Sequence, residues 1–356
     1  QEFVICTPRL CPSLRDVRMW GYIAQRIGLF VPTLLFITLL SFALSRLAPG
    51  DPAALKVGVG AEGGITGRAG LNERTLELLR KQWHLDKPLW QQYLLWLRDL
   101  VTLEFGRSFQ DNRPVLEKIA ERLPITLAMN LFAVLIAYGI AIPLGVYSAT
   151  HSGTALDRFL TFLLFALYSL PSFWVAMLAV TFLCNPEYLA LFPTGGIRSI
   201  FHSEQWSLWQ RVLDYAWHLA LPMLVYTYAS FAFISRQMRS ALLEVLRQDY
   251  IRTAYAKGLP GRVVIWKHAV RNSLIPIVTL LAGILPTLIS GSVIVETIFS
   301  IPGMGELSFR ALVARDYPVI MAVFTLSAVL TLVGILLADI LYAVVDPRIS
   351  FARRAQ

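Results

Sequence analysis

The chain has 356 residues, of which 56% are hydrophobic and only 15% are charged. Soluble domains usually carry about 25% charged residues, so this composition excludes an ordinary soluble globular protein. The formal net charge is +9. We attribute the excess to membrane topology rather than to nucleic-acid binding, because the basic residues concentrate in one loop and no groove-reading motif accompanies them.

The N-terminal residues 1–18 differ from the rest and are treated as a leader whose origin the sequence leaves open. They hold Cys6 and Cys11; the third cysteine is Cys184. No CxxC pair occurs, and His and Cys never cluster at metal-ligand spacing, so we expect no metal site. No cleavable signal peptide is recognisable, so the first apolar run is expected to remain as a helix.

Six long apolar segments predict membrane-spanning helices. A hydrocarbon layer about 30 Å thick needs roughly 20 mostly apolar residues as a helix, and lipid forces every backbone group to be paired within the protein. The expected spans are about 27–47, 124–150, 159–183, 217–234, 274–295 and 317–345. The predicted fold class is therefore an all-α polytopic membrane protein.

The same segments divide the chain into regions. These are the leader (1–18), a first transmembrane helix (19–47), an extracytoplasmic region (48–123), a transmembrane core (124–345) with a loop at 236–272, and a tail (346–356). In the extracytoplasmic region, the Gly-rich residues 56–70 predict a flexible loop, and no phosphate-binding G-x-x-x-x-G-K-[ST] motif occurs. Short amphipathic helices are expected after Asn72 and after Pro88, packing at the outer membrane face.

Loop charge predicts the orientation. The segment between the fourth and fifth spans carries eight basic residues and only two acidic ones, Glu244 and Asp249. Cytoplasmic loops are enriched in Lys and Arg, so this loop is expected in the cytoplasm. With six spans, both termini are then cytoplasmic, and the basic tail agrees.

Within the basic loop, the sequence DYIRTAYAKG (249–258) predicts a short exposed helix. Asp249 is expected to cap its start and Gly258 to end it. The small residues Thr253, Ala254 and Ala256 would let a second protein approach the backbone closely. The residues alone leave an alternative equally open, in which the loop's arginines hold lipid head groups.

The stretch RTAYAKG (252–258) resembles the cytoplasmic EAA loop of permease subunits of ATP-binding-cassette importers. Arg252, Thr253 and Ala254 stand where the name-giving Glu-Ala-Ala stands, and Gly258 matches the loop's glycine. The Arg in place of Glu and the late LIP (274–276) are similar to the first-permease branch of the dipeptide and oligopeptide importers. Further matching motifs lie in family order: APGDP (48–52), LDKPLWQQYLLWL (85–97), LEFGRSF (103–109), RLPITLAMN (122–130), IPLGVYSA (142–149), YSLPSFW (168–174), ETIFSIPGMGEL (296–307), RDYPVI (315–320) and DPRI (346–349).

This resemblance implies a type I importer permease in the bacterial inner membrane that transports di- or oligopeptides. The implied partners are a second homologous permease, two ATPase subunits, an extracytoplasmic solute-binding protein and membrane lipid. ATP and Mg would be bound by the ATPases, so this chain would carry no cofactor and no catalytic residue. The residues implied for ATPase coupling are Asp249, Tyr250, Arg252, Thr253, Ala254, Ala256, Lys257 and Gly258. Ala254, Ala256 and Gly258 would provide close packing, and Arg252 and Lys257 polar contacts.

Other residues are weaker candidates. Tyr168, Pro171, Phe173 and Trp174 are assigned to the substrate pathway, because a proline break can line a cavity; an ordinary packing kink at Pro171 is the equally open alternative. Glu296 and Asp339 lie toward the ends of spans, which favours caps or ion-pair partners over proton carriers.

The cargo and the transport mechanism have alternatives. Close relatives of the same architecture carry nickel chelates, glutathione, sugar oligomers or peptide antibiotics. A self-sufficient secondary transporter or channel would show an inverted repeat and midplane ion sites, and the sequence shows neither.

Overall fold

The computed structural model describes residues 28–43, 77, 78, 80, 81, 86–200, 206–284, 288 and 291–345. Regular structure in these residues is helical, apart from one isolated bridge between Arg107 and Pro114. The chain forms two compact units. One comprises residues 1–104 with 324–356, and the other residues 105–323.

In the first unit, the first apolar run forms the helix Gly28–Ala43, and the segment after Pro88 forms α4 (Leu89–Val101). Aromatic contacts join the two helices: the ring centres of Phe42 and Tyr93 lie 5.4 Å apart in a T-shaped arrangement, and those of Phe42 and Trp96 lie 6.4 Å apart. The hydroxyls of Thr38 and Tyr93 are 3.1 Å apart. The predicted helix after Pro88 is confirmed; most of the one expected after Asn72, and the Gly-rich loop, lie outside the described residues.

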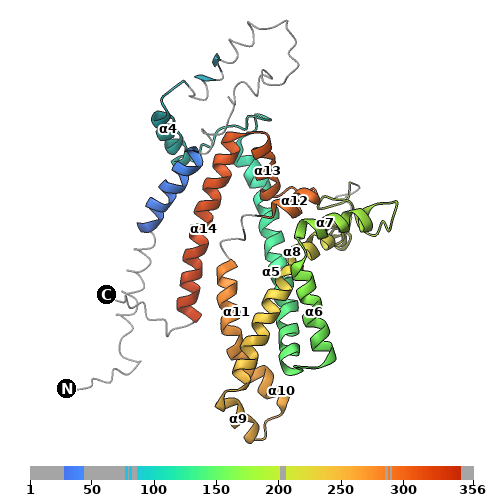
Figure 1. Cartoon of the computed structure of the whole chain (residues 1–356). Coiled ribbons are helices and arrows are strands. Elements are labelled where there is room, and N and C mark those ends of the chain that lie inside the picture. The colour runs from blue at the N-terminus through green and yellow to red at the C-terminus, as the bar shows by residue number, and fades with distance from the viewer. Residues whose placement is uncertain are drawn as a thin grey trace, which may run out of the picture. The chain divides into compact units, whose positions relative to one another are not determined.

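The second unit is built around α8 (Leu208–Leu246), which contacts α5 (Val115–Thr150), α6 (Ala155–Ser169) and α11 (Val270–Ile284). Figure 1 shows these helices side by side. The buried face of α5 repeats a small residue every fourth position: Ala133, Ala137, Ala141, Gly145 and Ala149. Small residues at this spacing let two membrane helices approach closely.

The closest approach is at Gly145. A Cβ atom there would lie 2.6 Å from the carbonyl oxygen of Ser235 and 2.7 Å from the Cβ of Met238, both on α8. Contacts this short are not sterically allowed, so glycine is required for the distance at which α5 and α8 pack.

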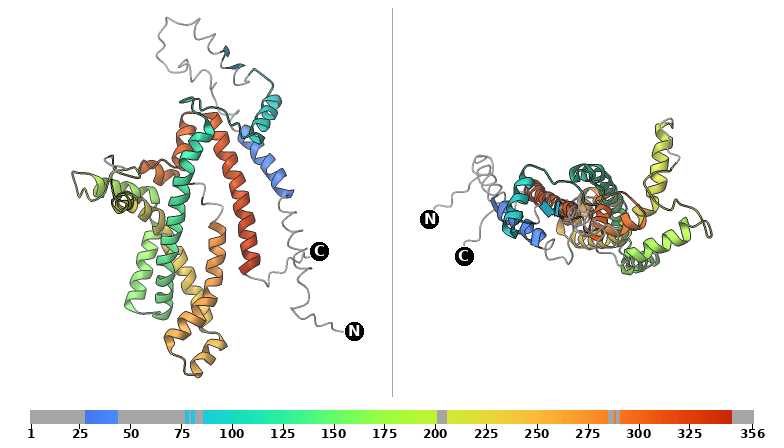
Figure 2. Two further views of the ribbon diagram at one scale, coloured as in Figure 1. Left: turned by 180° about the vertical axis from the view of Figure 1, so that it is seen from behind. Right: turned by 90° about the horizontal axis from the view of Figure 1, so that it is seen from above.

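The predicted third span is not one helix. α6 ends at Ser169, and α7 (Ser172–Ala179), followed by the π-helical turn η1 (Val180–Cys184), leaves it at an angle of 94°. Pro171 causes the break, because it has no N–H to donate and restricts the residue before it. The hydroxyl of Tyr228 donates to the carbonyl oxygen of Leu170 at 2.6 Å, which satisfies an acceptor at the break. Figure 2 shows α7 turned away from α6.

Three helices in the described residues are long and apolar enough to cross a membrane, or four if the bent pair α6–α7 is one span. The three are α5, α8 and α14 (Tyr317–Val345). The first helix is shorter, and α11 covers only the first part of the expected fifth span. The count of six spans therefore stays a prediction. The structure places Asp339 in α14, but its side chain is not among those described.

At the other end of the second unit from the basic loop, Glu296 has the capping role expected from the sequence. It lies in α12 (Val293–Ile298) and is 1% exposed. Its Oε2 accepts from the backbone N–H of Glu306 at 2.9 Å, in the first turn of α13 (Met304–Val313). Thr126 of α5 donates to Oε1 at 3.2 Å, so this carboxylate joins three helices. The carboxylate thus pairs N–H groups that a helix start leaves without an intrahelical acceptor.

Candidate functional site

The predicted exposed helix of the basic loop is α9 (Asp249–Ala256), which follows α8 at the end of the second unit (Figure 1). The prediction that Asp249 caps it is wrong. The N-cap is Gln248, which makes no side-chain hydrogen bond, and Asp249 is the first helical residue. Its carboxylate is exposed and lies 3.8 Å from Nη1 of Arg252.

The prediction that Gly258 ends the helix is confirmed. Gly258 has φ +75°, a left-handed conformation that costs glycine nothing and other residues about 1 kcal/mol or more. Its N–H donates to the carbonyl of Tyr255 at 2.9 Å, and the N–H of Leu259 donates to Ala254 at 3.4 Å. This pair of bonds is a Schellman motif, which satisfies the last carbonyls of α9.

One face of α9 is fixed to the rest of the unit. Ile251 is 1% exposed and Ala254 7% exposed, and both belong to a cluster with Met238 and Leu242 of α8 and with Val264. The small side chain of Ala254 therefore packs within this chain, and the close packing against an ATPase expected of it stays a prediction. Burial of this kind orders α9 even without a partner.

The opposite face of α9 is open. Tyr250 and Tyr255 are 42% and 49% exposed, and the remaining predicted coupling residues are also exposed: Asp249, Arg252, Thr253, Ala256, Lys257 and Gly258. The Nδ2 of Asn272 donates to the hydroxyl of Tyr250 at 2.8 Å, which links this face to α11. The result is an ordered surface with two aromatic rings and two cations.

After α9 the chain forms a short helix, α10 (Gly261–Val263), and a π-helical turn, η2 (Val264–Ala269), that leads into α11. The π-helical turn was not predicted from the sequence. Its i→i+5 bonding is rare and depends on the tertiary packing of Val264 and Ala269, which are fully buried.

The residues assigned to the substrate pathway come together at the α6–α7 break. Pro171 is the N-cap of α7, and Tyr168, Phe173 and Trp174 are 58%, 53% and 46% exposed. Tyr168 lines a groove between α6 and α8 in which the guanidinium of Arg236 lies 4.2 Å from the ring centre of Phe165. The break predicted at Pro171 is confirmed, while contact with a substrate stays a prediction.

A buried polar cluster near the turn between α5 and α6 was missed from the sequence. Asp157 is 3% exposed; it accepts from Ser148, from the N–H of Gly153 at 2.9 Å and from Arg239 of α8 at 3.3 Å. Thr154 is the N-cap of α6 and accepts from the N–H of Asp157. The Thr-x-x-Asp spacing is the signal that could have located this turn.

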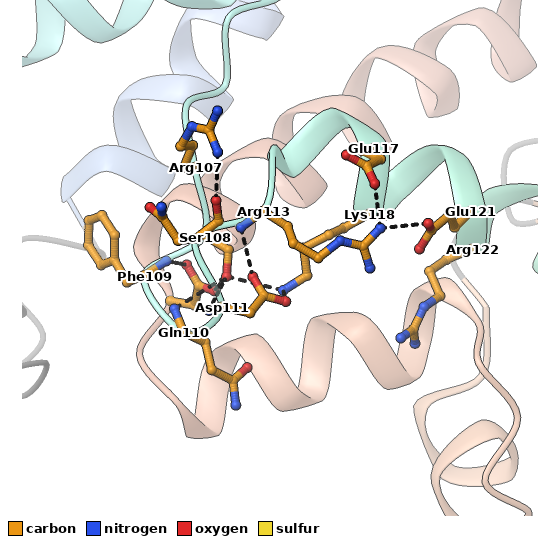
Figure 3. A network of polar contacts seen from close by, with 12 residues as sticks. Arg107, Ser108, Phe109, Gln110, Asp111, Arg113, Glu117, Lys118, Glu121 and Arg122 are labelled. Carbon is orange, nitrogen blue, oxygen red and sulfur yellow. Dashed lines mark hydrogen bonds and ion pairs between the residues drawn. The ribbon is translucent and has the colours of Figure 1, made fainter.

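A second network lies around the start of α5 and of α14 (Figure 3). Lys118 donates to Asp111 at 2.8 Å and to Ser108 at 3.1 Å, and Ser108 donates to Asp316 at 2.5 Å. Partial burial of Asp111 opposes its ionisation, but hydrogen bonds from Lys118, Ser108 and the backbone of Arg113 lower its pKa to about 2.

The same end of the unit carries further ion pairs. Arg113 donates to Glu117 and to Glu121, each at 2.6 Å, and the carboxylate of Glu306 pairs with both Arg122 and Arg310. Arg113 thus joins the loop 105–114 to α5, and the pair of Arg122 with Glu306 joins α5 to α13.

Comparison with known families shows to which family this chain belongs. Residues 141–351 match the model of the binding-protein-dependent transport system inner membrane component, and residues 19–130 match the N-terminal model for the same systems. The chain belongs to this family. It is therefore a multi-pass permease component of an ATP-binding-cassette importer, a membrane component without a catalytic role.

Curated relatives support the membership along almost the whole chain. The oligopeptide transport system permease protein AppB of Bacillus subtilis is 40% identical over 94% of this chain and 100% of its own. The dipeptide transport system permease protein DppB of Escherichia coli K12 is 36% identical over 93% of this chain and 99% of its own.

Among solved structures, an inward-facing form of the MetNI methionine ABC transporter matches with a TM-score of 0.51. The match covers 66% of this chain and 99% of the other, at 19% identity. At that identity the likeness shows the fold alone, and it confirms the predicted type I importer permease fold.

Proposed function

We propose that this chain forms half of the translocation pathway of an importer for di- or oligopeptides. In this proposal it is coupled to separate ATPase subunits through α9. A second homologous permease supplies the other half of the pathway, and an extracytoplasmic binding protein delivers the cargo. ATP and Mg are bound by the ATPases and not by this chain.

The observation that supports the coupling role is that α9 has one buried face and one exposed face. One face, with Ile251 and Ala254, is anchored in the cluster shared with α8, and the other presents Tyr250, Tyr255 and Lys257. A lever between two subunits needs both faces, because an unanchored helix would move without moving the spans. The basic charge of this loop supports its cytoplasmic placement, and with it both termini in the cytoplasm.

The peptide cargo is supported by the names of the two relatives above, both of which are peptide permeases. Nickel chelates, glutathione and peptide antibiotics remain the alternative cargoes of this architecture. A self-sufficient secondary transporter is the alternative from another class. We place the substrate path beside the α6–α7 break, where Tyr168, Phe173 and Trp174 leave large surfaces uncovered by this chain.

Reconstitution in vesicles tests the proposal. The complete complex, with binding protein outside and ATP inside, should accumulate labelled dipeptide or oligopeptide. Omission of the ATPases should abolish uptake. Uptake by this chain alone would refute the proposal. ATP-dependent uptake of a nickel chelate, without uptake of any peptide, would show that the cargo is a nickel chelate and not a peptide.

A further inference from the structure

A basic, aromatic surface lies beside α9 but is separate from it. Arg262, Val263, Trp266 and Lys267 line a shallow groove on α10 and η2. Trp266 is 52% exposed and Val263 37% exposed, and both cations are open to solvent. We call these four residues the basic groove.

The cations of the basic groove lack acidic partners in the part of the chain that the structure describes. Some other arginines of the second unit are paired: Arg239 with Asp157, Arg252 with Asp249, and Arg310 with Glu306. Arg262 and Lys267 have no carboxylate within ion-pair distance among the described residues. The basic groove therefore presents uncompensated positive charge.

The groove also stands next to an apolar helix. η2 runs directly into α11, which exposes Ile275 and Leu281 at 52% and 38%. Arg271, exposed on the first turn of α11, precedes Ile275 by one helical turn, about 6 Å along the axis. Exposed apolar side chains and positively charged side chains thus follow each other on one helix, as they do at the boundary of a membrane.

A tryptophan side chain has a preferred position at a membrane boundary. Its ring is amphipathic, with one N–H, and it concentrates at the level of lipid headgroups. Juxtamembrane Lys and Arg are attracted to anionic lipids of the cytoplasmic leaflet. The combination of Trp266 with Arg262 and Lys267 matches a phosphate headgroup attached to an apolar chain.

We propose that the basic groove binds the phosphate headgroups of anionic phospholipids of the cytoplasmic leaflet. It holds the base of the loop at the membrane surface and leaves the exposed face of α9 for the ATPase. This inference rests on the cytoplasmic placement of the loop in the proposed function. It divides the loop into a lipid-facing part (262–267) and a partner-facing part (249–258).

Local lipid enrichment measures this binding. The complete complex is reconstituted in phosphatidylcholine vesicles that contain a minor fraction of brominated phosphatidylglycerol or, in a parallel set, of brominated phosphatidylcholine. Bromine quenches a tryptophan it touches, and the difference between wild type and Trp266→Phe isolates the signal of Trp266. We expect stronger quenching of Trp266 by the anionic lipid than by the zwitterionic one.

The cations set the size of the effect. Each Lys or Arg near an anionic surface contributes about a fivefold preference. Arg262→Ala and Lys267→Ala should each reduce the excess quenching by about that factor, and the double variant should abolish it. Arg158→Ala is the matched control, because Arg158 is an exposed arginine on the first turn of α6 and lies outside both the basic groove and α9; it should leave the quenching of Trp266 unchanged.

Two results would overturn the proposal. Equal quenching by the two lipids would show that the groove does not select anionic headgroups. Absence of quenching by either lipid, with quenching restored when the ATPases are left out, would show that an ATPase subunit covers the groove instead. Uptake of peptide by the wild-type complex is measured on the same vesicles, so a failure of the importer function is distinguished from a failure of lipid binding.

Discussion

Gly145→Ala should separate α5 from α8. The added Cβ would lie 2.6 Å from the carbonyl oxygen of Ser235 and 2.7 Å from the Cβ of Met238. Ordinary contacts of a Cβ begin near 3.4 Å, so the backbone of one helix must move by roughly 0.8 Å. A backbone carbonyl cannot rotate away as a side chain does, and overpacking of this kind costs about 1–3 kcal/mol.

The matched control is Gly139→Ala on the same helix. A Cβ at Gly139 would meet nothing within 4 Å, so this change only replaces glycine by a better helix former, which favours the helix by about 1 kcal/mol. Thermal unfolding of the purified complex, followed by tryptophan fluorescence, should show a lower midpoint for Gly145→Ala and an equal or higher one for Gly139→Ala. The reasoning is refuted if the two variants unfold at the same temperature.

Three further changes test other contacts. Gly258→Arg should prevent the ATPases from co-purifying with the permease, while the permease still inserts into the membrane. Gly258→Asn should retain the ATPases, because asparagine tolerates positive φ. Assembly of the complex with the Arg variant would argue against docking at α9. Tyr228→Phe should destabilise the complex by about 1–3 kcal/mol in thermal unfolding, because the carbonyl of Leu170 loses its donor, and an unchanged midpoint would show that another donor replaces it. The pKa of Asp111 is lowered to about 2 in the folded chain, so its contribution to stability is complete above its ordinary pKa near 3.8 and is lost as the pH falls to about 2. Asp111→Asn should remove that part of the acid dependence, and an identical pH profile would contradict the role of Lys118.

The spans could be predicted because they depend on local composition, but their ends could not. The prediction began the fourth span at residue 217, whereas α8 begins at Leu208, behind a capping box formed by Ser207 and Gln210. That Ser-x-x-Gln signal is present in the sequence and was overlooked. The second span likewise begins at Val115, nine residues before the predicted start, because Pro114 suits a helix start and charged side chains on α5 are paired.

Some features of the candidate site could be predicted from the sequence and others could not. The left-handed conformation at Gly258 could be predicted from the residue type, because few residues other than glycine adopt positive φ. The burial of Ala254 depends on Met238 and Leu242, which lie in a different helix, and so could not be read from the loop. The same holds for Asp157 and Arg239, whose contact exists only once α6 has packed against α8.

The anchoring of α9 has a mechanical consequence. Because Ile251 and Ala254 share a core with Met238 and Leu242, the end of α8 cannot stay in place when α9 is pushed. α8 is a continuous helix of 39 residues, about 58 Å long, and its Tyr228 holds the carbonyl at the α6–α7 break. Leu246 and Tyr228 are separated by 18 steps of the helix, or about 27 Å along its axis. In the proposed function, a force applied to α9 would therefore act on the segment of α8 between Leu246 and Tyr228, and tilting of that segment, rather than stretching of a loop, would carry the force to the α6–α7 break.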